Sequence, residues 1–361
     1  MAESRNLDLL RTVAVLLVLV DHLFMAAGLA SSFPIVYDIG KLGVLLFFVH
    51  TSLVLMLSLE RTQSREGGHL FRAFYIRRAF RIYPLTVACV LLCTVFRVPQ
   101  QFGSAASARS VFQVATNLLL VQNLAGQSSV ISPLWSLPLE IQMYVVLPFL
   151  FVFAGRHSAK ALLALGCSLA LAGLAYERLL DMHVIAGLKR LDILNYAPCF
   201  VAGVMAYRLS TNRARRPVLA SWLWPAAVGS LVALYGGWQV AFPHPLDRIP
   251  AYRGWVVCWI LGAIIPQFRE IRLGWLRKAS HYVAKYSYGI YLGQVPALWI
   301  GFTFWPHMGG ILRWLVSVAL LAGIAVGGYH LIEHPGISVG KRVADRSNRS
   351  RSRPMELQVG A

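Results

Sequence analysis

The stretch NLDLLRTVAVLLVLVDHLF, residues 6–24, is an apolar run that contains an arginine, Arg11, and a histidine, His22. At about 100° per residue, the step between them is about three helical turns plus 20°, so both side chains share one helix face. They lie about 16 Å apart along the axis, one near the starting side of a bilayer and one beyond its middle. Because ionisable groups are costly inside a membrane and mark functional sites by default, the stretch predicts a spanning helix with a chemical role.

Two other interpretations of this stretch stay open. A basic start, an apolar core and small residues after it also describe a cleavable signal peptide, although Asp21 and His22 interrupt the core. A lone histidine in a helix is more often a packing residue, with Asp21 beside it as a partner. Asp8, three residues before Arg11, lies on the same helix face and is placed to neutralise it.

The composition indicates an all-α polytopic membrane protein. The 361 residues are 57% hydrophobic and only 14% charged, with a mean hydropathy of +0.59, whereas soluble domains contain about 25% charged residues. The five cysteines lie in or beside apolar runs without ligand spacing, so neither a disulfide framework nor a metal site is expected.

About ten apolar runs are long enough to cross roughly 30 Å of hydrocarbon, which puts both termini on one side. Lys and Arg concentrate on the cytoplasmic flank. With a cytoplasmic N-terminus, 24 of these residues fall inside and only 7 outside, so both termini are expected in the cytoplasm. This asymmetry explains most of the net charge of +19 without nucleic acid as a partner. The predicted spans are 7–27, 36–58, 82–98, 133–154, 159–176, 191–209, 217–240, 252–268, 284–303 and 311–333.

The domain organisation is simple, because no internal repeat and no appended soluble domain is visible in the sequence. Residues 6–335 form one transmembrane domain, and residues 336–361 are expected to be a basic, disordered cytoplasmic tail that meets anionic lipid. The longest outside connection is 99–132. Its portion 110–124 is short and polar for a span and is interpreted as an interfacial or re-entrant helix.

A second group of residues lies in RAFYIRRAFRIYP, residues 72–84, where the chain enters the membrane from the cytoplasm. Arg81 lies three residues after Arg78 and four after Arg77, so neighbouring guanidinium groups project from one face. Arginine suits bidentate phosphate contacts, which fits a phosphate-bearing cosubstrate. The alternative is ordinary anchoring of a span, which Pro84 is expected to open.

A third group lies in SPLWSLPLEIQMYVVLP, residues 132–148. Trp135 suits the outer interface, and Glu140 follows one to two turns into the membrane, in the same outer half as His22. Carboxylate and imidazole at similar depth predict an acid–base or orienting pair, unless Glu140 only bonds a neighbouring helix. Further on, 286–296 is rich in tyrosine, and Glu333 ends the last span near the cytoplasm.

Together, these segments resemble the acyltransferase 3 family of integral-membrane O-acyltransferases, in order from residue 6 to about 335. LDLLRTVAVLLVLVDH is similar to the first-helix motif of that family, an Arg and a His separated by ten residues. LGVLLFFVHTSLVL resembles its second span and RRAFRIYP its Arg-x-x-Arg segment. PLWSLPLEIQMYVVLP resembles its Trp-Ser-Leu…Glu-x-x-x-Tyr…Pro segment, and YSYGIYL and IEHP its late motifs.

The chain departs from the family pattern at three places. Thr51-Ser52 stands where the family usually has Ser-Gly, and Gln294 stands where it usually has His after Tyr-Leu. Pro138 is also less typical and is expected to bend the start of its helix.

The resemblance implies an O-acyltransferase that moves an acyl group, most often acetyl, from acyl-CoA to a hydroxyl of a cell-surface carbohydrate or lipid-linked sugar. It further implies a multi-pass protein of the plasma (inner) membrane, bacterial, that modifies polysaccharide by O-acetylation. Acyl-CoA is then a cosubstrate, and no permanently bound cofactor or metal is expected. Acceptor choice is expected to rest on outside loops such as 99–132 and 243–253.

The resemblance also implies roles for the site residues. Arg78 and Arg81, with Arg77 nearby, would hold the phosphates of coenzyme A. His22 would be the general base on the acceptor or the acyl relay, Arg11 would steady the donor or the oxyanion, and Glu140 would orient His22. Residues in supporting positions are Asp8, Asp21, Trp135, Ser136, Tyr144, Ser287, Tyr288, Tyr291 and Glu333.

Two alternatives come from other functional classes. A transporter or flippase would use Arg11, His22 and Glu140 as a buried proton or substrate pathway, although such proteins often show inverted repeats. An inactive family member acting as a membrane partner would fit the altered second-span motif and Gln294.

Overall fold

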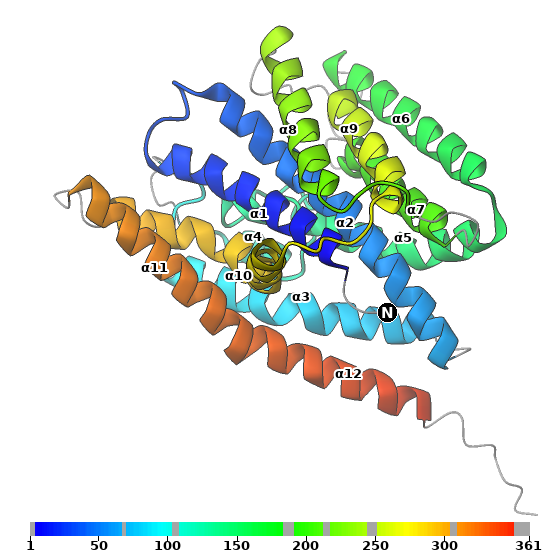
Figure 1. Ribbon diagram of the computed structural model, residues 1–361. Coiled ribbons are helices and arrows are strands. Elements are labelled where there is room, and N and C mark those ends of the chain that lie inside the picture. The colour runs from blue at the N-terminus through cyan, green and yellow to red at the C-terminus, as the bar shows by residue number, and fades with distance from the viewer. Residues whose placement is uncertain are drawn as a thin grey trace, which may run out of the picture.

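The computed structural model describes residues 4–66, 70–102, 108–182, 191–211, 217–243, 251–303 and 309–349. Within these ranges the chain is helical, without a strand, and has an isolated bridge between Leu219 and Phe268. Figure 1 shows the helices, which are α1 (Arg5–Ala26), α2 (Pro34–Glu66), α3 (Leu70–Val95), α4 (Val111–Leu118), η2 (Ser132–Trp135), α5 (Leu137–Arg156), α6 (Ala159–Asp181), α7 (Ile193–Ser210), α8 (Leu223–Ala241), α9 (Ala251–Ile264), η4 (Ile265–Gln267), α10 (Gly274–Thr303), α11 (Gly310–Gly328), η5 (Tyr329–Glu333) and α12 (His334–Arg349).

The helical membrane fold is confirmed in its coarse form. Among the described residues, 6 helical stretches are long and apolar enough to cross a membrane, and each overlaps one of the predicted spans. The other predicted spans are also helical, in α7, α8, α9 with η4, and α10, but a total of about ten crossings stays a prediction. The membrane-capable stretches are Arg5–Ala26, Pro34–Ser64, Leu70–Val95, Ser132–Arg156, Ala159–Asp181 and Gly310–Arg346.

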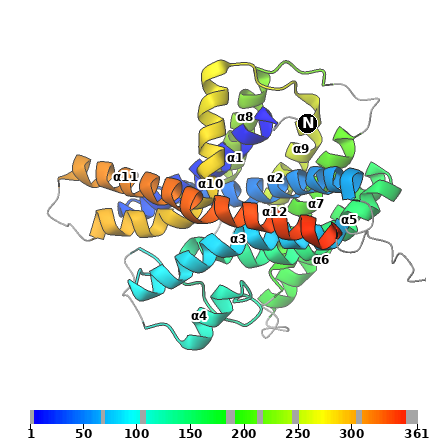
Figure 2. The same ribbon diagram turned by 90° about the horizontal axis from the view of Figure 1, so that it is seen from below.

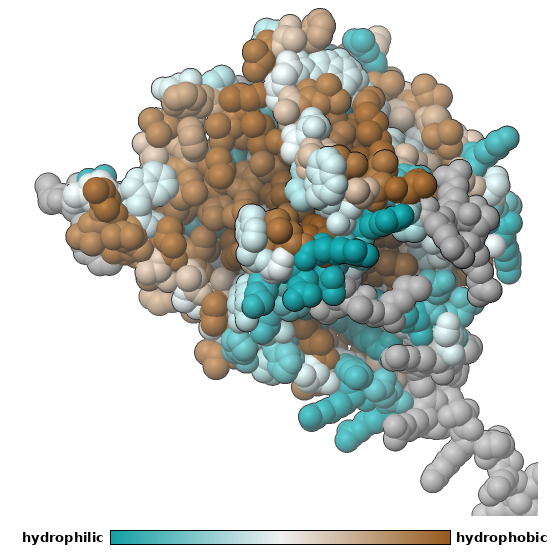
Figure 3. Space-filling model, in the orientation of Figure 1, coloured by the Kyte–Doolittle hydropathy of each residue, from teal (hydrophilic) through white to brown (hydrophobic). Residues whose placement is uncertain are grey.

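The ends of the long helices fall on two opposite sides of the molecule. Figure 1 shows the start of α1 and the end of α12 on one side, with the end of α1 and the start of α11 on the other. The face in Figure 3 is largely apolar, and its hydrophilic side chains gather toward the side where α12 ends. This arrangement supports a bilayer around the apolar part, while the compartment that faces each side remains predicted from the charge bias.

The centre of the bundle is made by α2, which packs against α1 on one flank and α7 on the other. Residues 197–207 of α7 are buried throughout. Close approach depends on Gly203, because a Cβ there would lie 2.0 Å from Ser52 Oγ and 2.3 Å from the Val49 carbonyl oxygen. Small residues at helix contacts are the usual means of bringing membrane helices together.

We expect Gly203→Ala to lower stability by about 1–3 kcal/mol, because an added methyl forces α2 and α7 apart. The measurement is the thermal midpoint of the purified protein in detergent. Gly229→Ala is the matched control in α8, where a Cβ would meet nothing within 4 Å, and its midpoint should not fall. Equal midpoints for both variants would contradict the packing account.

Two sequence predictions about α3 and the C-terminal region are corrected. The helix begins at Leu70, so Pro84 lies inside α3 and not at its start. The prediction of disorder from residue 336 is wrong for 336–349, because α12 continues α11 through η5 as one rod beside α3 (Figure 2). Gly336 allows this contact, since a Cβ there would lie 2.8 Å from the Phe80 carbonyl oxygen. Residues 350–361 lie outside the described residues.

The described part of the connection 99–132 packs against α3 through α4 and contains a shorter helix than predicted. Of 110–124, only Val111–Leu118 is α-helical, and the chain turns at Leu120 with a φ of 56°. Arg109 holds separate parts of this region together. Its guanidinium donates hydrogen bonds to the backbone carbonyls of Cys93, Val98 and Val130. Residues 103–107 of this loop, and 244–250 of the loop 243–253, lie outside the described residues.

Candidate active site

A narrow cavity of about 90 Å³ lies where α1, α2, α3, α5 and α10 meet. We call it the inner cavity, because it lies toward the predicted cytoplasmic side. It brings together most of the residues that the motifs predicted on separate spans. The polar side chains that line it are Arg11, His50, Thr51, Arg78, Arg81, Ser136, Glu140, Tyr144, Ser287, Tyr288 and Tyr291.

Three arginines line the inner cavity, and they differ in their hydrogen-bond and ion-pair partners. Arg11 Nε donates to Ser287 Oγ over 2.6 Å. Arg81 forms an ion pair of 2.9 Å with Glu333, which is fully buried on the π-helical turn η5. Arg78 Nε is buried and has no hydrogen-bond partner among the described residues. An unpaired buried donor is costly, so Arg78 is the cation best placed to receive an anionic ligand.

Arg77 lies outside this group, contrary to its predicted place beside Arg78 and Arg81. Its guanidinium donates to Thr62 Oγ1 over 3.0 Å and forms an ion pair of 3.2 Å with Asp345 of α12. The reason is helical rotation, since consecutive residues point about 100° apart. Arg77 therefore joins α3 to α2 and α12.

Glu140 belongs to the inner cavity as well. Its carboxylate accepts hydrogen bonds from the hydroxyls of Tyr144 and Thr51, and it faces the charges of Arg11 and Arg78. His22 does not line this cavity, so the predicted pair of Glu140 with His22 is wrong. Glu140 instead balances the arginines.

Tyrosines of α10 close the inner cavity on one side. The Tyr288 hydroxyl donates to the Ile82 carbonyl over 3.0 Å. The Tyr291 hydroxyl donates to the Pro133 carbonyl over 2.8 Å and is 2.7 Å from Ser136 Oγ. Because Tyr291 uses its only proton on Pro133, the Ser136 hydroxyl is the donor in the second bond. These bonds fasten α10 to α3 and η2.

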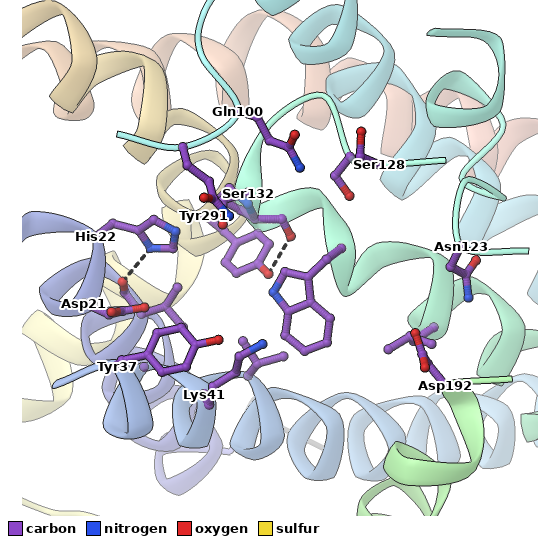
Figure 4. Close-up of a pocket in the computed structure, with 18 of the residues that line it drawn as sticks. Asp21, His22, Tyr37, Lys41, Gln100, Asn123, Ser128, Ser132, Asp192 and Tyr291 are labelled. Carbon is purple, nitrogen blue, oxygen red and sulfur yellow. Dashed lines mark hydrogen bonds between the residues drawn. The ribbon is translucent and has the colours of Figure 1, made fainter. Parts of the chain in front are cut away.

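A larger cavity of about 430 Å³, the outer cavity, lies beyond this wall (Figure 4). Val44 and Tyr291 line both cavities, so the two are neighbours. Besides Tyr291, the predicted residues found here are Asp21, His22 and Trp135. The connection 99–132 supplies most of the remaining polar lining, namely Gln100, Gln101, Gln122, Asn123, Gln127, Ser128, Ser129 and Ser132.

His22 is held in a defined orientation on the wall of the outer cavity. Its Nδ1 lies 2.9 Å from the Val18 carbonyl oxygen, and the ring meets Phe102 edge-on. A carbonyl only accepts hydrogen bonds, so Nδ1 carries the proton in the neutral imidazole. Nε2 is then the unprotonated nitrogen, the one that can accept a proton from a substrate.

The sequence was also compared with models of known protein families. The model of an acyltransferase domain, acyltransferase 3, matches residues 4–332. The chain belongs to the acyltransferase 3 family. The resemblance drawn from the motifs is thereby confirmed, and the protein is a multi-pass membrane acyltransferase. Searches of curated proteins and of solved structures gave no match.

In this acyltransferase the departures from the family pattern have different consequences. Thr51 takes part in the inner cavity through its bond to Glu140. Ser52 is structural, because its hydroxyl bonds the Phe48 carbonyl over 2.8 Å and packs on Gly203. Gln294 is completely buried, and neither of its amide atoms has a hydrogen-bond partner among the described residues.

Two charged residues of the candidate site, Lys41 and Asp192, were not predicted from the sequence. Lys41 Nζ lies 4.0 Å above the Trp135 ring, close to the carboxylates of Asp21 and Asp192. The signal was present, since Lys41 is an ionisable residue in an apolar run, as Arg11 is. Asp192 had no such signal. Asp8, predicted to neutralise Arg11, forms an ion pair of 3.1 Å with His281.

Proposed function

We propose that this acyltransferase moves an acyl group, acetyl in the first instance, from acyl-CoA to a hydroxyl of a cell-surface carbohydrate or lipid-linked sugar. The membrane in question is the plasma (inner) membrane of a bacterium. The observation that carries the proposal is the pair of neighbouring cavities. One is lined by arginines. The other is lined by His22, by many neutral polar side chains and by Asp21, Lys41 and Asp192, and Val44 and Tyr291 belong to both.

The inner cavity fits the donor. Arg78 and Arg81 hold its phosphates near the cytoplasmic end, where the unpaired Nε of Arg78 supplies a free hydrogen-bond donor. The cavity of about 90 Å³ is too small for a nucleotide, so we place only the thioester end of the donor inside it. Arg11, fixed by Ser287, steadies that end deeper in the bundle.

The outer cavity fits a sugar acceptor. Gln122 and Asn123 line it, and Gln122 Oε1 and Asn123 Nδ2 are buried without hydrogen-bond partners among the described residues. Buried polar groups are normally paired, so an acceptor rich in hydroxyls would supply the missing partners. The Trp135 ring offers an aromatic wall, as ligand sites commonly do.

In the proposed mechanism His22 transfers the proton, and residues between the inner and outer cavities stabilise the carbonyl oxygen. His22 Nε2 takes the proton of the acceptor hydroxyl, whose oxygen forms a new bond to the thioester carbonyl carbon while the carbon–sulfur bond breaks. The thiolate then receives the proton from His22. Tyr291 lines both cavities, and Arg11, which lines the inner cavity, supplies positive charge for the oxygen of the tetrahedral intermediate.

The test measures transfer by purified protein from acyl-CoA labelled in the acyl group to de-O-acylated surface glycan. We expect labelled glycan and free CoA in equal amounts. Mass spectrometry of surface glycans from cells with and without the protein should show the matching acyl groups. Solute uptake without acyl transfer, or glycans with an unchanged acyl pattern, would overturn the proposal.

A further inference from the structure

A further cavity of about 530 Å³, which we call the side cavity, lies beside the outer cavity. It is formed mainly by α6, α7 and α9, which contribute no residue to the inner cavity. Four residues line both the side cavity and the outer cavity, so the two share one wall. These residues are Tyr37, Lys41, Trp135 and Tyr196.

The shared wall is positioned by contacts between α2, η2 and α7. Lys41 Nζ lies over the Trp135 ring at 4.0 Å, and the Trp135 and Tyr196 rings pack at 5.4 Å. Figure 4 shows Tyr37 and Lys41 rising from α2 on one flank of the outer cavity, with Asp192 and Asn123 on another. His22 lines the outer cavity alone, so the side cavity lies on the other side of this wall from His22.

The lining of the side cavity has the same chemistry as that of the outer cavity. Its lining includes the aromatic residues Tyr252 and Trp255 and the charged residues Glu177, Arg178 and Asp181. Asn195 Oδ1 is buried and has no hydrogen-bond partner among the described residues. Aromatic faces with hydrogen-bonding groups suit a hydroxyl-rich ring. An aliphatic chain would offer no hydrogen bond to Asn195 Oδ1.

We propose that the side cavity binds the sugar unit adjacent to the one that is acylated, so that the acceptor is a chain of at least two sugar units. The reacting unit lies in the outer cavity beside His22, and the linkage crosses the wall of Lys41 and Trp135. This inference rests on the proposed function and narrows its acceptor from a free monosaccharide to an oligosaccharide or polymer.

The test uses de-O-acylated surface glycan that is partly hydrolysed and separated into one-, two- and three-unit fractions. Purified protein transfers labelled acetyl from acetyl-CoA to each fraction, and kcat/KM is measured for each. We expect kcat/KM to be at least about tenfold higher for two units than for one. Equal values would overturn the inference while leaving the proposed function intact. Failure to transfer to any fraction would overturn both.

Variants connect the preference to the side cavity. We expect Tyr252→Ala to reduce the preference for two units over one about tenfold, because it removes an aromatic wall. Asn195→Ala should reduce it too and serves if Tyr252→Ala is not monodisperse on gel filtration. Tyr282→Ala is the matched control, since Tyr282 is 61% exposed and lines none of the three cavities. If both side-cavity variants keep the wild-type preference, the inference is wrong.

Discussion

Replacing His22 with alanine is expected to lower acyl transfer about a hundredfold to ten-thousandfold, the usual contribution of a general base. The reason is that Nδ1 is committed to the Val18 carbonyl, which leaves Nε2 as the nitrogen that accepts the acceptor proton. The measurement is the initial rate of label transfer from acyl-CoA to glycan. Binding of acyl-CoA should persist, because His22 lies outside the inner cavity.

Two further variants make the His22 prediction specific. His22→Gln keeps a donor toward the Val18 carbonyl but has no basic nitrogen, so it should be as inactive as His22→Ala. His157→Ala is the matched control, because His157 is exposed at the end of α5, and it should transfer normally. If His22→Ala loses donor binding together with transfer, His22 is structural and the assignment as a base fails.

Replacing Arg78 with alanine is expected to raise the Kd for acyl-CoA about tenfold to a hundredfold. A hydrogen bond to a charged group contributes about 1.5–3 kcal/mol, and each 1.4 kcal/mol corresponds to about a factor of ten. The structural reason is that Arg78 lines the inner cavity with an unpaired Nε. Equilibrium binding of a non-hydrolysable acyl-CoA analogue measures the effect without requiring an acceptor.

A conservative variant of Arg78 and a variant of Arg72 on the same helix provide the controls. Arg78→Lys keeps the charge but loses the bidentate fork, so its Kd should lie between those of wild type and Arg78→Ala. Arg72→Ala should bind normally, because Arg72 is exposed and lines none of the three cavities. Equal affinities for all four proteins would place the phosphates elsewhere.

Much of the candidate site could be predicted from the sequence because helical periodicity fixes which residues of one helix share a face. The spacing from Arg78 to Arg81 placed both on the inner cavity. The step from Arg11 to His22 put them at two depths, and they line two different cavities. These inferences needed only the rise and turn of a single helix.

Inferences that required two helices were less secure. Glu140 was expected near His22 because both lie at a similar depth, yet depth does not say which faces of two helices meet. Packing turns Glu140 toward Tyr144 and the arginines. In the same way, α12 packs along α3 through glycines and an ion pair, where composition alone indicated a disordered tail.

The sequence by itself therefore determined a helical membrane acyltransferase, its family motifs and the order of charged residues along each helix. Hydrophobicity and helix geometry are local properties, so they can be inferred from the sequence of one segment at a time. Only the tertiary structure decided that the predicted residues divide between the inner and the outer cavity. It also decided that the side cavity, lined mainly by α6, α7 and α9, lies next to the outer cavity. Such neighbours depend on how side chains of different helices interlock, and no spacing along one helix encodes that contact.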